Sequence, residues 1–221
     1  MLAGSKSTPP FGFTLQSSTG GGTGTITVPS SINAGDLGIL VEGAYKTPTN
    51  TSPASGWVQA GFYQYSTYQG ASIWYKKLTT ADRSTTLTTL QGSSGGYDAS
   101  LLVVLRPDKP FTSISSLSWD ADGTTSGVQI STFMASTAND RLYIGSSYVV
   151  NTSSASFPLD LTSAGVAVTT DFDEEETGSS FVGMQAKIVE ANSGNAFTIV
   201  GNNNVSGKFN AAMSFYLAFT Y

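Results

Sequence analysis

Residues 95–105, GGYDASLLVVL, closely match residues 207–217, GKFNAAMSFYL, near the end of the chain. In both stretches apolar side chains occupy every second position. Successive side chains of a β-strand point to opposite faces of a sheet, so this period of two predicts a strand with one apolar face in each stretch. The apolar positions are Tyr97, Ala99, Leu101, Val103 and Leu105 in the first stretch, and Phe209, Ala211, Met213, Phe215 and Leu217 in the second.

The segments before these two stretches recur in the same order. Three further pairs of segments align, namely 26–40 with 130–144, 72–78 with 183–189, and 85–90 with 196–200. The first alignment places Asp36 on Asp140 and Gly35 on Asn139, and Gly and Asn are the residues that most readily form left-handed turns. The recurrence predicts two tandem copies of one module of about a hundred residues. Two unrelated β-domains with similar turns are the alternative.

The composition favours an all-β fold. Charged residues are only 11% of the 221 residues, and Thr, Ser and Gly separate short apolar runs. No stretch shows the 3.6-residue period of an amphipathic helix, and residues 78–86, LTTADRSTT, are expected to form a turn between strands. We therefore expect two antiparallel β-sandwich modules, Ig-like or jelly-roll-like, from an internal duplication. The expected parts are an N-terminal arm over residues 1–9, a first module over 10–108 and a second module over 109–221.

The charge and the missing residue types argue against several function classes. The net charge is −5, and ten scattered Lys and Arg residues cannot form the basic stripe that a nucleic acid requires. No apolar run is long enough to cross a membrane, and the N-terminus lacks the features of a secretory signal. The chain contains no His and no Cys, which excludes imidazole and thiolate chemistry. We expect a non-enzymatic protein without a cofactor, a nucleic-acid partner or a membrane contact.

The acidic segment 170–180, TDFDEEETGSS, is the main candidate for carboxylate chemistry. Consecutive residues of a hairpin project to alternate sides, whereas a glycosidase needs two carboxylates that face each other across a cleft. Clustered oxygens suit Ca²⁺ better, and Asp171, Asp173 and Glu175 are weak candidates for its ligands. A solvated hairpin tip, whose charges discourage edge pairing, is the favoured interpretation, so no metal site is expected.

The matching position of the first half is aromatic, with the sequence FYQYSTYQGASIWY over residues 62–75. Strand alternation buries some of these side chains, but a hairpin tip with three Tyr residues cannot bury them all. Exposed Tyr side chains serve protein interfaces and sugar platforms alike. We expect Tyr63, Tyr65 and Tyr68 to contact a partner subunit, with ordinary strand aromatics and glycan stacking as the alternatives.

The N-terminal arm, MLAGSKSTPP, has too little apolar surface to fold by itself. Pro9 and Pro10 favour an extended backbone, and Met1 and Leu2 offer a small apolar anchor. We expect the arm to contact a neighbouring copy or another protein of an assembly through Met1 and Leu2.

Four motifs of the first half resemble a known group of modules. They are ITVPSSINAGDLGILVEGA (26–44), SGWVQAGF (55–62), ASIWYKKL (71–78) and YDASLLVVLRP (97–107). Together they resemble β-sandwich modules of tailed-bacteriophage structural proteins and of some bacterial surface proteins. The resemblance covers residues 11–108, whereas the second half lacks the SGW motif. Because these motifs are turn and core signatures, they specify a fold better than a function.

The resemblance implies a structural protein of the virion, made in the host cytoplasm. Capsid decoration is the first expectation, and a tail or fibre component is the second. Its partners would be other virion proteins, and it would form a homo-oligomer such as a trimer. The alternative function is a carbohydrate- or receptor-binding module at a tail tip or on a cell surface.

Overall fold

The computed structural model shows an all-β protein over the residues that it describes. These are residues 13–21, 24–45, 50, 52–65, 69–90, 98–124, 130–134, 141–150, 159–163, 166–167, 172–179, 182–191, 197–201 and 209–220. Apart from one 3-10 turn, η1 (Thr80–Asp82), all regular elements among them are strands. Every strand pairing among them is antiparallel. The expectation of an all-β fold is confirmed, and η1 lies within the turn expected over residues 78–86.

The N-terminal half, residues 13–107, contains a five-stranded sheet and a small outer pair of strands. The sheet strands are β1 (Phe13–Gly21), β3 (Leu37–Tyr45), β4 (Val58–Tyr65), β5 (Gln69–Lys77) and β7 (Asp98–Pro107). They form the first sheet in the order β1-β7-β3-β5-β4. The outer pair consists of β2 (Thr25–Thr27) and β6 (Thr86–Thr88).

The C-terminal half, residues 113–220, contains a five-stranded sheet and an outer four-stranded sheet. The second five-stranded sheet has the order β13-β14-β10-β16-β8, and the outer sheet has the order β12-β11-β15-β9. The strands are β8 (Ser113–Thr124), β9 (Ile130–Met134), β10 (Arg141–Val150), β11 (Leu159–Ser163), β12 (Val166–Ala167), β13 (Phe172–Ser179), β14 (Val182–Ala191), β15 (Phe197–Gly201) and β16 (Phe209–Thr220).

The two halves have the same strand order. In chain order, β1, β3, β4, β5 and β7 correspond to β8, β10, β13, β14 and β16, and each set forms its five-stranded sheet in the same sequence of neighbours. The outer pair β2-β6 corresponds to β9-β15, which are also neighbours. The short strands β11 and β12 are additional and lie in the chain between β10 and β13.

The strand register refines the alignment of the halves. Leu37 lies opposite Leu105 in the first sheet, and Leu142 lies opposite Leu217 in the second, with all four side chains 0% exposed. The sequence alignment matches Leu37 with Arg141 and Leu105 with Leu217, but Arg141 lies opposite Ala218, so the two alignments taken together differ from the register by one residue. Asp140 lies outside the described residues, and its match with Asp36 stays a prediction. Registers of neighbouring strands are coupled through their pairing, whereas a sequence alignment treats each segment alone.

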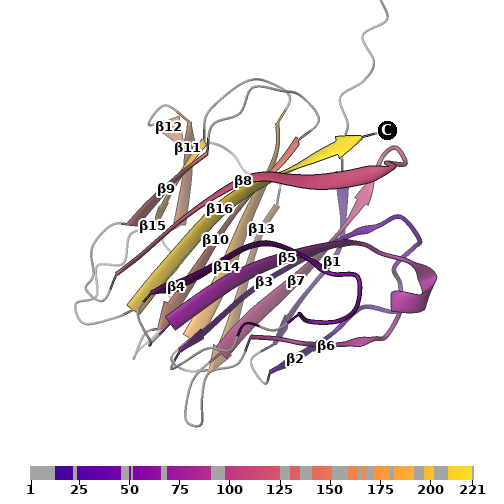
Figure 1. Ribbon diagram of the computed structural model, residues 1–221, viewed down its shortest axis with the longest axis horizontal. Coiled ribbons are helices and arrows are strands. Elements are labelled where there is room, and N and C mark those ends of the chain that lie inside the picture. Colours follow the sequence, from indigo (N-terminus) through magenta and orange to yellow (C-terminus); the bar gives the residue numbers. More distant parts are fainter. Residues whose placement is uncertain are drawn as a thin grey trace, which may run out of the picture.

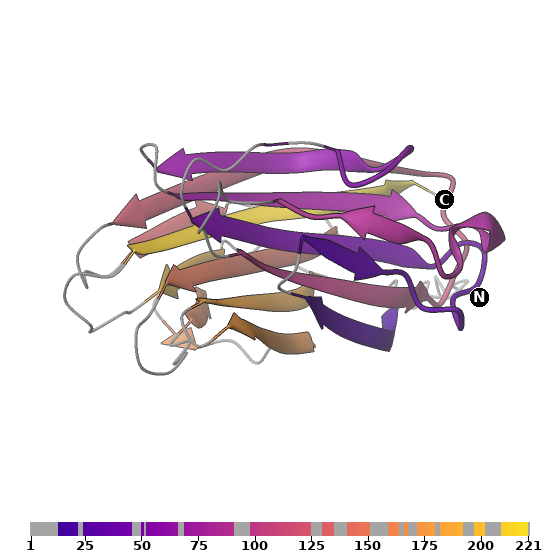
Figure 2. The same ribbon diagram turned by 90° about the horizontal axis from the view of Figure 1, so that it is seen from below.

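The two five-stranded sheets pack against each other, and the smaller sheets lie outside them (Figure 1). At the edges, β4 lies against β8 and β1 lies against β13, while β3 lies against β10 in the middle. Figure 2 shows that the strands of both sheets run roughly along the long axis of the molecule. The first sheet is therefore covered on both faces, by the second sheet on one side and by the outer pair on the other.

This double cover explains the burial pattern of the first sheet. Its side chains Leu40, Trp74, Leu102 and Val104 pack with Ile26 and Leu87 of the outer pair. The alternate side chains, which point to the opposite face, are equally buried: Ile39, Val41, Ile73, Leu101, Val103 and Leu105 are 0–2% exposed. The sequence predicted one apolar face for β7, but Ala99–Leu105 are buried throughout. Layers on both sides of a sheet remove the solvent-facing side.

A five-residue linker, residues 108–112, joins β7 to β8. Thr112 donates hydrogen bonds from its N–H and its Oγ1 to the carbonyl of Thr220, at 2.7 and 3.0 Å. The Phe111 ring packs on Phe219 with a centroid distance of 5.3 Å, and Phe219 packs on Phe13 at 5.1 Å. The linker is thus fixed to the last strand of the chain. As the sequence predicts for β16, Leu217 and Phe219 are buried, whereas the side chain of Phe215 lies outside the described set.

Candidate functional site

The motifs of the first half meet at one corner of the first sheet. A Cβ atom added to Gly38 would lie 2.9 Å from Cη2 of Trp57 and 3.2 Å from a methyl group of Leu78. Only glycine therefore lets the indole of Trp57 pack directly on strand β3. Gly38, which follows the sequence GDL, and Trp57 of the SGW motif pack directly against each other. This contact explains why the two motifs occur together.

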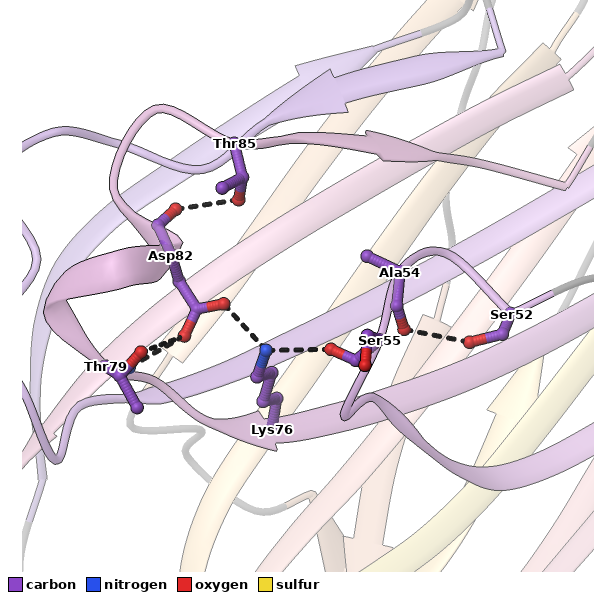
Figure 3. A network of polar contacts seen from close by, with 7 residues as sticks. All are labelled: Ser52, Ala54, Ser55, Lys76, Thr79, Asp82 and Thr85. Carbon is purple, nitrogen blue, oxygen red and sulfur yellow. Dashed lines mark hydrogen bonds and ion pairs between the residues drawn. The ribbon is translucent and has the colours of Figure 1, made fainter.

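A lysine fixes the turn that carries Trp57 (Figure 3). Lys76 donates hydrogen bonds to the carbonyl of Ser55 at 2.9 Å and to Oδ1 of Asp82 at 2.7 Å. Gly56 has a positive φ of 81°, and a Cβ atom there would lie 3.2 Å from the Lys76 side chain. Ser52 adds a hydrogen bond from Oγ to the carbonyl of Ala54 at 3.0 Å. Lys76 thus connects the SGW turn to η1.

Asp82 organises the turn at η1. Its Oδ2 accepts hydrogen bonds from the N–H and the Oγ1 of Thr79, both at 2.8 Å, and its carbonyl accepts one from Thr85 Oγ1 at 2.7 Å. Burial alone would raise the pKa of Asp82, but hydrogen bonds from Lys76 and Thr79 outweigh burial and lower it. Asp82 and Lys76 therefore form a structural ion pair, with side chains only 12% and 17% exposed.

Asp36 holds the turn that precedes β3. Its carboxylate is 1% exposed and accepts two hydrogen bonds from Arg106 at 2.9 Å, through Nε and Nη2. A third donor is the N–H of Asn33 at 2.7 Å. Gly35 completes the turn with a φ of 96°, which suits glycine. Asp36 therefore binds the end of β7 to the start of β3.

A hollow of about 440 Å³ opens beside this turn, at the linker between the two halves. We name it the linker hollow, and its lining residues are Asn33, Ala34, Gly35, Asp36, Lys77, Arg106, Pro107, Pro110 and Phe111. Lys77 lies 4.7 Å from the centroid of the Phe111 ring and donates a hydrogen bond to the Phe111 carbonyl. The lining carries two cations and one carboxylate, and all three already have partners within the chain. Arg106 is bonded to Asp36, and Lys77 is bonded to the Phe111 carbonyl, so these charges hold the linker against the first half.

A buried carboxylate lies in the middle of the first sheet. Glu42 is 0% exposed, and its Oε1 accepts hydrogen bonds from Ser72 Oγ at 2.5 Å and Trp74 Nε1 at 2.6 Å. Its Oε2 accepts one from the N–H of Leu90 at 2.7 Å. Burial raises the pKa of Glu42 to about 7, although these hydrogen bonds lower it. The carboxyl group holds the segment after β6 against the sheet.

The sequence-predicted contact residues are only partly described. Tyr63 is half-buried in β4, and Tyr65 ends the same strand. Tyr68, Met1 and Leu2 lie outside the described residues. Tyr63 and Tyr65 belong to β4, an edge strand of the first sheet, and Tyr65 forms the last pair of this strand with Gln69 of β5. The expected partner contact of these residues stays a prediction.

The acidic segment also forms a strand. Asp173 and Glu175 belong to β13, opposite Lys187 and Gln185 of β14, whereas Asp171 lies outside the described residues. The expectation of a hairpin tip is therefore wrong for residues 172–179, because this segment pairs with β14 along its length. Within the described part of the chain, no three Asp or Glu side chains group as metal ligands would.

Sequence reasoning missed Glu42, Lys77 and Arg106 as residues of interest. The signal for Glu42 was present, since it is a lone charge in the apolar run GILVEGA. A charged residue at such a position is buried only if donors surround it. The partners of Glu42 and Arg106 are 30 to 70 residues away in the chain, and no local pattern indicates them.

Comparisons with known proteins add no relative. No protein-family model matches the chain, and no curated protein or solved structure shows significant similarity to it. Among the residues that the structure describes, no helix is long and apolar enough to span a membrane.

Proposed function

We propose that this chain is a non-enzymatic structural protein of a tailed-phage virion, with capsid decoration ahead of a tail or fibre role. The observation that supports the proposal best is that the motif residues stabilise the fold. Gly38, Trp57 and Lys76 belong to the motifs on which the resemblance depends, and all three bind or pack against groups of the same chain. They build a rigid corner of the fold. A structural protein of a virion contributes shape and contacts to the particle, and both require a rigid fold.

Two ion pairs of the N-terminal half support the same role. Asp36 is saturated by Arg106 and Asn33, and Asp82 is held by Lys76 and Thr79. These charges stabilise turns. They are therefore poorly placed to serve as exchangeable acids or bases.

The finer fold proposal is that residues 10–108 and 109–221 are two duplicated β-sandwich modules that follow an arm over residues 1–9. The repeated strand order of the two halves supports it. Each half also has its own smaller sheet outside the five-stranded one. The connections between the two sheets of each module decide whether its topology is jelly-roll-like or Ig-like.

In the virion, the chain would assemble as a homo-oligomer such as a trimer and would bind other virion proteins. The proposed contacts are the arm, with Met1 and Leu2, and the aromatic segment with Tyr63, Tyr65 and Tyr68. No cofactor, nucleic acid or membrane has a part in this proposal.

Immunogold labelling tests the proposed location. Antibodies against the recombinant chain should label particles of the phage that encodes it, on the head for decoration or on the tail for a fibre role. Purified particles that carry neither the label nor the protein would contradict the proposal.

Deleting residues 1–9 tests the arm. The truncated chain should melt at nearly the same temperature as the intact chain but should fail to enter particles. Incorporation at the level of the intact chain would remove the arm from the assembly contacts.

Changing Tyr63, Tyr65 and Tyr68 together to Ser tests the aromatic segment. Incorporation into particles should fall while far-UV circular dichroism stays unchanged. Retained incorporation together with lost binding on a glycan array would favour the carbohydrate-binding alternative.

A further inference from the structure

The contacts between the two five-stranded sheets are reciprocal, except that β14 lies against β3 without an equally close contact of β5 with β10. β1 lies against β13, and the counterpart of β1, which is β8, lies against β4. β7 lies against β14 and β13, while its counterpart β16 lies against β5 and β4. β3 lies against its own counterpart, β10. An interface in which each element meets the counterpart of its partner is isologous, which is the pattern of a two-fold homodimer.

The N-terminal half contributes an aliphatic surface to this interface. The residues of the first sheet that point away from the outer pair form its inner face, and the central positions of this face are Ile39, Val41, Ile73, Leu101, Val103 and Leu105. Removing such side chains from water is strongly favourable, and a contiguous apolar surface of this kind is rarely left exposed, so the inner face requires a cover. Aliphatic side chains carry no charge or hydrogen-bonding group that would reject a similar partner.

We propose that the inner face of the N-terminal half is self-complementary, so that a second copy of this half can take the place of the C-terminal half. In the resulting homodimer, β3 of one copy lies against β3 of the other, β1 lies against β4, and β7 lies against β5. The proposal rests on the duplication proposed above, because the strand correspondences define which elements meet.

The test begins with the intact chain. A protease site is inserted after Asp108, which is exposed in the linker, and the folded chain is cleaved there. The fragments are separated in denaturant, and the fragment of residues 1–108 is refolded alone. We expect a folded species with twice the mass of the fragment in native mass spectrometry. A folded species with the mass of one fragment would overturn self-pairing and still leave the module proposal intact.

Cysteine cross-linking distinguishes the predicted dimer from nonspecific association. The chain contains no Cys, so Val41→Cys introduces a single thiol on the inner face, at the middle of β3. Under oxidation, the refolded fragment should form a disulfide-linked dimer. The matched control, Thr86→Cys on an exposed position of the outer pair, should not. In the intact chain Val41→Cys should not cross-link chains, because β10 covers β3.

A fragment that folds only when the C-terminal fragment is added would also overturn the proposal, because the inner face would then be specific for the C-terminal half. Equal cross-linking of Val41→Cys and Thr86→Cys would do the same, because it would show association without a defined face. Failure of the fragment to fold in any mixture would contradict both self-pairing and the module proposal.

Discussion

Glu42 is a carboxylate inside an apolar sheet without a cation beside it among the described residues. Its three hydrogen-bond donors come from Ser72, Trp74 and the backbone of Leu90. These donors stabilise the ionised form, whereas burial destabilises it more strongly and raises the pKa to about 7. The folded chain therefore binds this proton more tightly than the unfolded chain does.

The raised pKa predicts that stability falls as pH rises. The contribution of Glu42 is fully present below its unfolded pKa of 4.5 and is lost as pH rises to the folded pKa of about 7. The loss corresponds to about 3 kcal/mol of unfolding free energy. Urea denaturation across this range should show the slope in the wild type and a much flatter profile in Glu42→Gln. Asp108→Asn, at an exposed carboxylate, is the control and should keep the slope; an identical profile for Glu42→Gln would contradict the assignment.

The contact between Gly38 and Trp57 predicts a coupled pair of substitutions. Gly38→Ala should cost about 1–3 kcal/mol, because its Cβ atom would overlap the indole ring. Trp57→Phe removes the ring atom that would clash, so the added cost of Gly38→Ala should be smaller in that background. A double-mutant cycle measured by chemical denaturation gives the coupling. Additive effects would show that the two residues do not meet.

At the scale of elements, Arg106 and Asp36 join the end of β7 to the start of β3. Arg106→Leu should cost about 2 kcal/mol or more, because it leaves the buried carboxylate of Asp36 with one donor, the N–H of Asn33. Arg83→Leu is the control, since Arg83 is exposed and donates to the carbonyl of Ile32. Thermal melting should show the larger loss for Arg106→Leu. Equal losses would contradict the structural role of the ion pair.

The positions of the strands can be predicted from the sequence, whereas the order of the strands in the sheets cannot. The period of two in residues 97–105 and 209–217 predicts β7 and β16, and the turn at Asp36 is expected from Gly35. The acidic segment was expected as a hairpin tip because charges usually face water, yet it pairs along β14 as β13. β13 is an edge strand, and charged side chains on an edge strand discourage pairing with another chain. Such placement depends on sheet order, which no local pattern encodes.

At the scale of the molecule, the fold places the two halves sheet to sheet, and the first sheet lies between two layers. The sequence suggests the repeat but not this packing, because alternation predicts one covered face for each strand. The aliphatic residues Leu102 and Val104 occupy the face opposite to that of Leu101 and Val103, and all four are buried. Continuous apolar runs of this kind are typical of strands covered on both sides.

Cleavage of the linker in the folded chain tests this packing most directly. With the protease site after Asp108, the two fragments should stay together and elute from size exclusion at the volume of the intact chain, in equimolar amounts. They should separate only under conditions that unfold the chain, because the apolar inner face of the first sheet holds them together. Two separate folded fragments after cleavage would contradict the packing of the two five-stranded sheets against each other.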